Sequence, residues 1–149
     1  MHSLSRLPAS LRGAFLLAAL CAAPGFSQDE AAPAEDLPLA GFTAEQAEAG
    51  ELAYRQSCLS CHGSNLNNGT FGPPLKGRPF REDFFDVPAS VLFAYVTNAM
   101  PPNAPGSLQH SAYAGIIAYI MQENGIEAGD TPLPSNAEEL QELLLARPE

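Results

Sequence analysis

Two cysteines and a histidine are the residues of this 149-residue chain whose spacing most clearly suggests chemistry. Cys58 and Cys61 are separated by two residues, and His62 follows the second cysteine directly. Three kinds of site use such a pattern: a dithiol redox pair, a zinc site, and covalent attachment of haem. In the third kind, each thiol adds across one haem vinyl group, and the next side chain then lies under the iron.

The rest of the sequence favours haem over the alternatives. A thioredoxin-like pair needs a strand-helix context, and no segment of this chain alternates as a strand does. Zinc needs four ligands, so His110 and an additional oxygen would have to complete the site. A plain disulfide is the remaining alternative. We therefore predict one covalently bound haem c, attached through Cys58 and Cys61, with His62 as an axial iron ligand.

Three side chains are candidates for the second axial ligand of the iron: Met100, Met121 and His110. Met100 ends a predicted helix within NAMPPNAPG, where prolines stiffen a loop that can present the thioether. Met121 falls on the apolar stripe of the next helix, where packing in the core is the simpler interpretation. His110 begins that same helix, and we interpret it as a polar surface residue. The predicted ligand is therefore Met100.

The first 27 residues have the layout of a secretory signal peptide. Arg6 and Arg12 precede the apolar run GAFLLAALCAA, and small residues with a turn follow it. The apolar run is too short to span a bilayer. We therefore predict export to the periplasm, cleavage near Ser27, and no membrane span in the mature chain.

Charge and cysteine content exclude several classes of function. The formal net charge is −10, so binding of nucleic acid through a basic surface is excluded. The third cysteine, Cys21, would leave with the signal peptide, and its lipidation is disfavoured because the bulky Leu20 precedes it. Two remaining thiols cannot build a four-cysteine zinc site or a framework of several disulfides.

The segment before the cysteine pair is predicted to be an extended leader followed by a helix. Residues 28–41 are rich in alanine, proline and acids and contain little that can be buried, which indicates a flexible leader. A capping box, Thr43 with Gln46, then starts a helix that we expect to run into the cysteines. Residues 63–86 are rich in glycine, asparagine and proline and are predicted to form a long structured loop.

Three further helices are predicted after this loop. One follows Pro88, and the next spans about residues 108–124 with an apolar stripe. A short third helix is predicted after the break GDTPLP, with Ser135 and Glu138 as its capping box. The predicted divisions of the chain are a signal peptide (1–27), a leader (28–41), a haem-binding domain (42–126) and a C-terminal extension with the short helix (127–149).

Between residues 49 and 125 these features resemble the class I c-type cytochromes. In that family a glycine and an aromatic residue on the first helix pack against an aromatic residue on the last. The matching residues here are Gly50, Tyr54 and Tyr119. The resemblance implies an all-α fold in which three to four helices wrap around one covalently bound haem.

The same resemblance implies further contacts to the haem and its ligands. A Gly-Pro loop follows the haem motif, here FGPPLKG, and the Pro73 carbonyl is expected to accept a hydrogen bond from the His62 ring. Some members bind the haem propionates through a tryptophan, but this chain has none. Arg78 or Arg81 is expected to take that role.

The sequence that begins at Met100 narrows the resemblance. The run MPPNAPGSLQHSAYAGIIAYIMQENGIEAG is similar to small cytochromes paired with, or fused to, pyrroloquinoline-quinone (PQQ) sugar and alcohol dehydrogenases. It implies a single-haem electron carrier without catalytic residues, which takes electrons from a quinoprotein dehydrogenase and passes them to a terminal oxidase or another cytochrome. The alternative is a haem-based sensor whose sixth iron site opens to bind a small ligand.

The charges are segregated along the chain. Residues 28–54 carry seven acids and no base, residues 55–81 carry four bases and no acid, and residues 87–122 carry no charged side chain other than histidine. In the class I arrangement the last two segments wrap the haem, so its exposed edge is predicted to be nearly uncharged. A partner would then approach through the following residues: Pro101, Pro102, Ala104 and Leu108.

Overall fold

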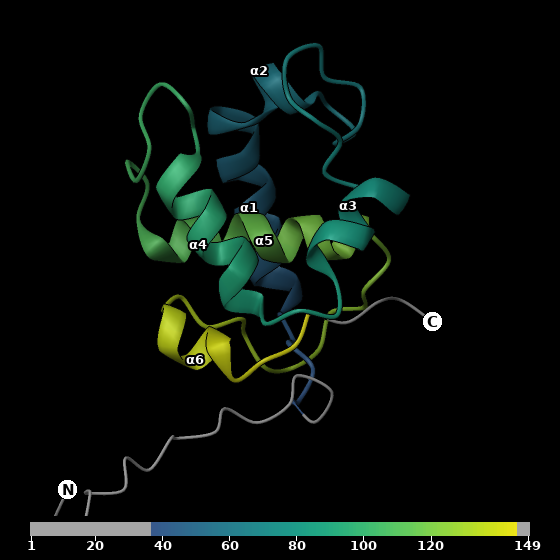
Figure 1. Cartoon of the computed structure of the whole chain (residues 1–149), viewed down its shortest axis with the longest axis vertical. Helices are drawn as coiled ribbons and strands as arrows, with labels where there is room; N and C mark the ends of the chain where they lie inside the picture. The colour runs from purple at the N-terminus through teal and green to yellow at the C-terminus, as the bar shows by residue number, and fades with distance from the viewer. Residues whose placement is uncertain (1–36, 146–149) are drawn as a thin grey trace, which may run out of the picture. The chain divides into compact units, whose positions relative to one another are not determined.

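Six helices and their connecting loops make up the part of the chain that this computed structural model describes, residues 37–145 (Figure 1). The helices are α1 (Ala44–Ser57), α2 (Leu59–His62), α3 (Arg78–Phe84), α4 (Ala89–Ala99), α5 (His110–Glu123) and α6 (Ala137–Gln141). Within residues 37–145 there is no strand, and extended pairing is limited to two isolated bridges. The fold is therefore all-α. The predicted signal peptide and most of the predicted leader lie outside the described residues.

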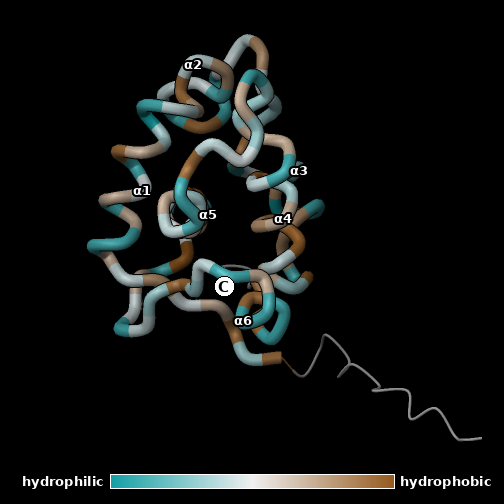
Figure 2. Tube along the Cα trace, turned by 90° about the vertical axis from the view of Figure 1, so that its left-hand side faces the viewer, coloured by the Kyte–Doolittle hydropathy of each residue, from teal (hydrophilic) through white to brown (hydrophobic). Residues whose placement is uncertain are grey.

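A close crossing of α1 and α5 lies at the centre of the helix packing. Gly50 of α1 meets Gly115 of α5, and a Cβ on Gly50 would overlap the Gly115 carbonyl oxygen. Beside this point the rings of Tyr54 and Tyr119 pack with their centroids 5.5 Å apart. Figure 2 shows α5 nearly end-on between α1 and α4, and residues 113–121 of α5 are all buried. The crossing therefore places α5 in the core, where it contacts both neighbouring helices.

The start of α1 matches only half of the predicted capping box. The Thr43 hydroxyl accepts a hydrogen bond from the Gln46 amide at 3.2 Å, as an N-cap does. The Gln46 side chain does not reach back to Thr43. It donates to the Leu133 carbonyl and accepts from the Leu133 amide, both at 2.8 Å. Gln46 thus connects the first turn of α1 to the C-terminal extension.

One prediction for the middle of the chain is confirmed and one needs correction. The first helix runs up to the cysteine pair as expected, since it ends at Ser57 with Cys58 as its C-cap, and α2 then forms a separate single turn. The segment 63–86, predicted to be loop throughout, contains the seven-residue helix α3. An isolated helix of this length is not stable in water. Phe80 of α3 is buried and Phe84 packs against Tyr95 of α4, so tertiary packing stabilises the helix.

The C-terminal extension is bonded through its backbone to two other parts of the chain. Leu144 exchanges two hydrogen bonds of 2.8 Å with residues 38–40, so the end of the predicted leader has a fixed position. Leu145 exchanges two with residues 86–87, at 2.7 and 3.0 Å. The short helix α6 begins one residue later than predicted, because Asn136, rather than Ser135, caps the Glu139 amide at 2.9 Å. The extension is thus part of the folded domain.

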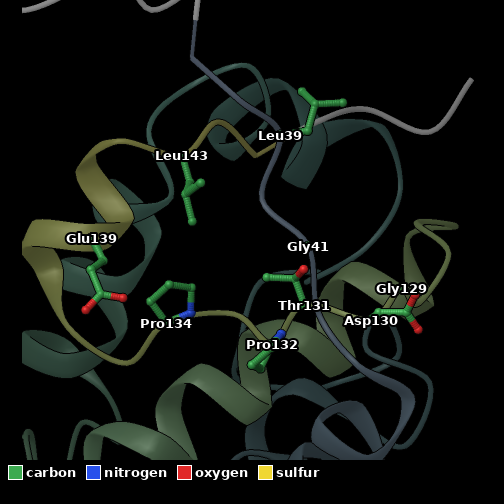
Figure 3. Close-up of a pocket in the computed structure, with 9 residues that line it drawn as sticks. All are labelled: Leu39, Gly41, Gly129, Asp130, Thr131, Pro132, Pro134, Glu139 and Leu143. Carbon is green, nitrogen blue, oxygen red and sulfur yellow. The ribbon is translucent and has the colours of Figure 1, made fainter.

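An open groove of about 450 Å³ lies beside these backbone pairings (Figure 3). Its lining combines Leu39 of the N-terminal segment with Pro134 and Leu143 of the extension. No cysteine, histidine or methionine lines it. Separately, none of the helices between residues 37 and 145 is long and apolar enough to cross a bilayer.

The crossing of α1 and α5 predicts that the variant Gly50→Ala is destabilised by about 2 kcal/mol in urea unfolding, because the added methyl overlaps backbone that cannot rotate away. This cost exceeds the ~1 kcal/mol that alanine gains over glycine in a helix. Gly129→Ala is the matched control, since nothing lies within 4 Å of its added Cβ. The midpoint of its urea unfolding should equal that of the parent. A Gly50→Ala protein as stable as the parent would contradict the packing described.

Candidate functional site

Cys58, Cys61 and His62 lie on one tight turn between α1 and the following loop. The Cys58 carbonyl accepts hydrogen bonds from the amides of Cys61 at 3.1 Å and His62 at 3.0 Å. Both thiols are free and half-buried. The turn therefore presents two thiols and an imidazole from one short stretch of backbone, which is the arrangement that covalent haem attachment needs.

The imidazole of His62 is buried and held in one orientation. Its side chain belongs to the few buried polar groups of the domain, with a residue exposure of 7 %. Nδ1 lies 2.8 Å from the Pro73 carbonyl oxygen. Because a carbonyl can only accept, Nδ1 carries a proton and donates a hydrogen bond to the Pro73 carbonyl. In the neutral ring Nε2 is then without a proton, which is the form that binds a metal.

The loop that supplies the Pro73 carbonyl passes directly against the imidazole. The Gly72 amide donates to the Cys61 carbonyl at 2.9 Å, which brings the loop back over the turn. A Cβ on Gly72 would lie 2.6 Å from Nδ1 of His62, so no larger residue fits without a shift of the loop or the ring. Glycine at this position thus permits the contact that orients the histidine.

A buried asparagine fixes the far end of the same loop to α5. The Asn124 side chain accepts from the Gly77 amide at 3.1 Å and donates to the Leu75 carbonyl at 3.0 Å. Lys76, between these two residues, pairs with Glu123 at 3.0 Å. These contacts join the loop to the end of α5. The loop that carries the Pro73 carbonyl is therefore attached on both sides of Pro73, by the Gly72 amide before it and by the Asn124 contacts after it.

The described residues disfavour both the redox-pair and the zinc alternatives. Burial, with a smaller effect from neighbouring Cys61, raises the pKa of the Cys58 thiol to about 11. The attacking cysteine of a dithiol oxidoreductase has a lowered pKa instead. Between residues 37 and 145 no three His, Cys, Asp or Glu side chains are grouped so that they could hold a metal ion together.

The three candidates for the second axial ligand occupy different environments. Met100 is the C-cap of α4 and is half-buried; its amide donates to Val96 at 3.1 Å, and its carbonyl accepts from the Tyr113 hydroxyl at 2.7 Å. Met121 is completely buried in the core. His110 is exposed at the start of α5, and its ring makes a T-shaped contact with that of Phe93.

The two arginines considered for the haem propionates also differ. The Arg78 side chain is 84 % exposed and pairs with Glu82, one helical turn away, at 2.6 Å. Arg81 is half-buried, and its guanidinium makes no ion pair within the described part of the chain. The charge of Arg78 is therefore already partly neutralised, whereas no acid among residues 37–145 pairs with Arg81.

The donor set fits a covalently attached haem. Two thiols on one turn can attach the ring, the oriented imidazole can bind the iron, and a thioether stands at the end of α4. Apolar side chains that flank the His62 and Met100 segments are only partly buried in the protein alone, so they leave apolar surface for a macrocycle to cover. These side chains are Leu59, Leu75, Val96 and Leu108.

Comparison with protein families supports the same chemistry. The family model described as "Cytochrome C oxidase, cbb3-type, subunit III" matches residues 45–120, which is half of the chain and runs from α1 into α5. The chain belongs to this family of c-type cytochromes. The cofactor of this cytochrome is accordingly haem c, covalently attached. No curated protein and no solved structure matches the chain significantly.

Some residues that organise the site of this cytochrome carry no clear sequence signal. Tyr113 falls on the apolar stripe of α5, and its bond to Met100 joins residues thirteen apart. Asn124 falls at the end of a predicted helix, yet it holds the loop after the haem motif. The one available hint is that each carries a polar group at or near an end of the buried run of α5, residues 113–121.

Proposed function

We propose that this cytochrome is a periplasmic electron carrier with one haem, bound through Cys58 and Cys61 and ligated by His62 and Met100. The observation that carries the proposal is the 2.8 Å contact between Nδ1 of His62 and the Pro73 carbonyl, because it leaves Nε2 free to bind iron. When bound, the haem supplies one-electron chemistry, and histidine-methionine ligation raises its reduction potential.

The chain's own residues position and shield this centre. The turn after α1 fixes the thiols and the imidazole, and the end of α4 presents the thioether. Arg81, which is half-buried and without an ion pair among the described residues, is better suited than the exposed Arg78 to neutralise a haem propionate. The proposal assigns no catalytic group to the chain, since positioning the iron and tuning its potential are sufficient for electron carriage.

A PQQ-dependent dehydrogenase is the proposed electron donor, and a terminal oxidase or another cytochrome the acceptor. The run from Met100 to Gly129, which resembles cytochromes paired with such dehydrogenases, supports this assignment. The loop after Met100 supports an uncharged docking surface. Pro102 and Ala104 are exposed in it, Pro101 and Leu108 are partly exposed, and no charged side chain other than histidine occurs between residues 87 and 122.

The first test is ligand replacement at the iron. We expect the reduced parent protein to show an unchanged low-spin spectrum under carbon monoxide, because methionine occupies the sixth site. Met100→Ala should open that site, bind carbon monoxide stoichiometrically and have a lower reduction potential. Met121→Leu is the control, since this buried side chain serves packing and a volume-conserving change costs less than about 1.5 kcal/mol.

Two outcomes would overturn the ligand assignment. If Met121→Leu opens the site and Met100→Ala does not, Met121 is the ligand. If the unmodified protein binds carbon monoxide readily, its sixth site is open, and a ligand-binding sensor describes it better than a carrier.

The second test addresses docking. An apolar docking surface predicts that the second-order rate of reduction by a PQQ-dependent dehydrogenase changes less than about twofold between low and physiological salt, because screening acts on charges. Ala104→Asp should slow the reaction and introduce a salt dependence, whereas Ala128→Asp, equally exposed but in the C-terminal extension, should not. A steep fall of the parent's rate with salt would mean that the acidic regions steer the partner.

A further inference from the structure

We propose that Tyr113 is a positioning residue for Met100, and that its hydroxyl controls how readily the sixth iron site opens to an added ligand. The inference rests on the proposed function, because it takes Met100 as the axial ligand. The backbone of Met100 must stay in place for the thioether to remain on the iron.

The contact is a partly buried hydrogen bond between two separate elements. Tyr113 lies in the first turn of α5 and is only 2 % exposed. Its Oη donates to the Met100 carbonyl at 2.7 Å. The Met100 amide donates to Val96 of α4 at 3.1 Å. Both polar backbone groups of Met100 are therefore bonded, one to α4 and the other to α5.

The loop that follows Met100 cannot easily replace this bond. Pro101 and Pro102 have no amide hydrogen, so the next two residues offer no backbone donor to the carbonyl. The hydrogen bonds within the loop are local, from Ala104 to Pro101 at 2.9 Å and from Ser107 to Ala104 at 3.3 Å. The Tyr113 hydroxyl is thus the contact by which α5 holds the Met100 backbone.

Opening of the sixth site requires the Met100 segment to move away from α5, which breaks this bond. In Tyr113→Phe the carbonyl is already without its donor in the closed state, while an open state in which water reaches the carbonyl is unaffected. The cost of leaving the partly buried Met100 carbonyl without its donor therefore falls on the closed state alone. We expect the equilibrium between closed and open forms to shift roughly tenfold toward the open form, within the range known for such groups.

The experiment measures cyanide binding to the ferric holoprotein by stopped-flow absorbance. Tyr113→Phe keeps the ring and the core packing and should bind cyanide roughly tenfold faster than the parent, in line with the shift in the opening equilibrium. Tyr54→Phe is the matched control, because its buried hydroxyl also donates to a carbonyl at 2.7 Å, that of Gly63. It should lose similar stability in urea while its cyanide rate stays within about twofold of the parent's.

Each result has a distinct meaning. A Tyr113→Phe protein that binds cyanide at the parent's rate overturns the proposal. Equal acceleration by Tyr54→Phe and Tyr113→Phe overturns it too, because general destabilisation would then explain both. Failure of the underlying function is recognised separately: if Met100→Ala leaves the spectrum and the carbon monoxide response unchanged, Met100 is not the ligand, whatever Tyr113→Phe does.

Discussion

The close approach of α1 and α5 at Gly50 and Gly115 determines where both proposed iron ligands lie. Helix α1 leads directly into the turn that carries His62, and α5 carries the tyrosine that holds Met100. Because no side chain fits on Gly50, the two helices have a single close-packed arrangement at this point. A change in that arrangement would move the imidazole and the thioether relative to each other, so the close packing at Gly50 serves the geometry at the proposed iron site.

Around this crossing, the chain uses hydrogen bonds to carbonyls to fix the two proposed iron ligands in place. The Pro73 carbonyl orients the imidazole, and the Met100 carbonyl is itself the point of attachment to α5. Such pre-set ligands change little between oxidation states, which suits rapid one-electron exchange. The C-terminal extension supports the arrangement from outside the matched family region, since it buries further leucines and bonds to the first turn of α1. A small domain buries a limited share of its surface, so these added core residues contribute considerably to its stability.

The local features of this fold could be predicted from sequence, and the long-range polar contacts could not. The Thr43 cap and the buried stripe of α5 follow from residue type and spacing, and both are present in the structure. Helix α3 escaped prediction because it is too short to form alone and depends on packing of Phe80. The Gln46 side chain bonds to Leu133, 87 residues away, instead of completing the capping box. No local sequence pattern indicates that partner. The difference between Arg78 and Arg81 depends on the missed helix α3, because that helix brings Glu82 within reach of Arg78 one turn earlier.

The central claim is that Met100 and His62 together ligate one covalently bound haem. The most direct measurement is a nuclear magnetic resonance spectrum of the reduced holoprotein labelled with ¹³C in its methionine methyl groups. A methionine bound to haem iron lies above the ring, whose ring current moves its methyl resonance far upfield. The account predicts one such resonance, which is retained in Met121→Leu and lost in Met100→Leu. The absence of an upfield methyl, or its loss in Met121→Leu, would contradict the account.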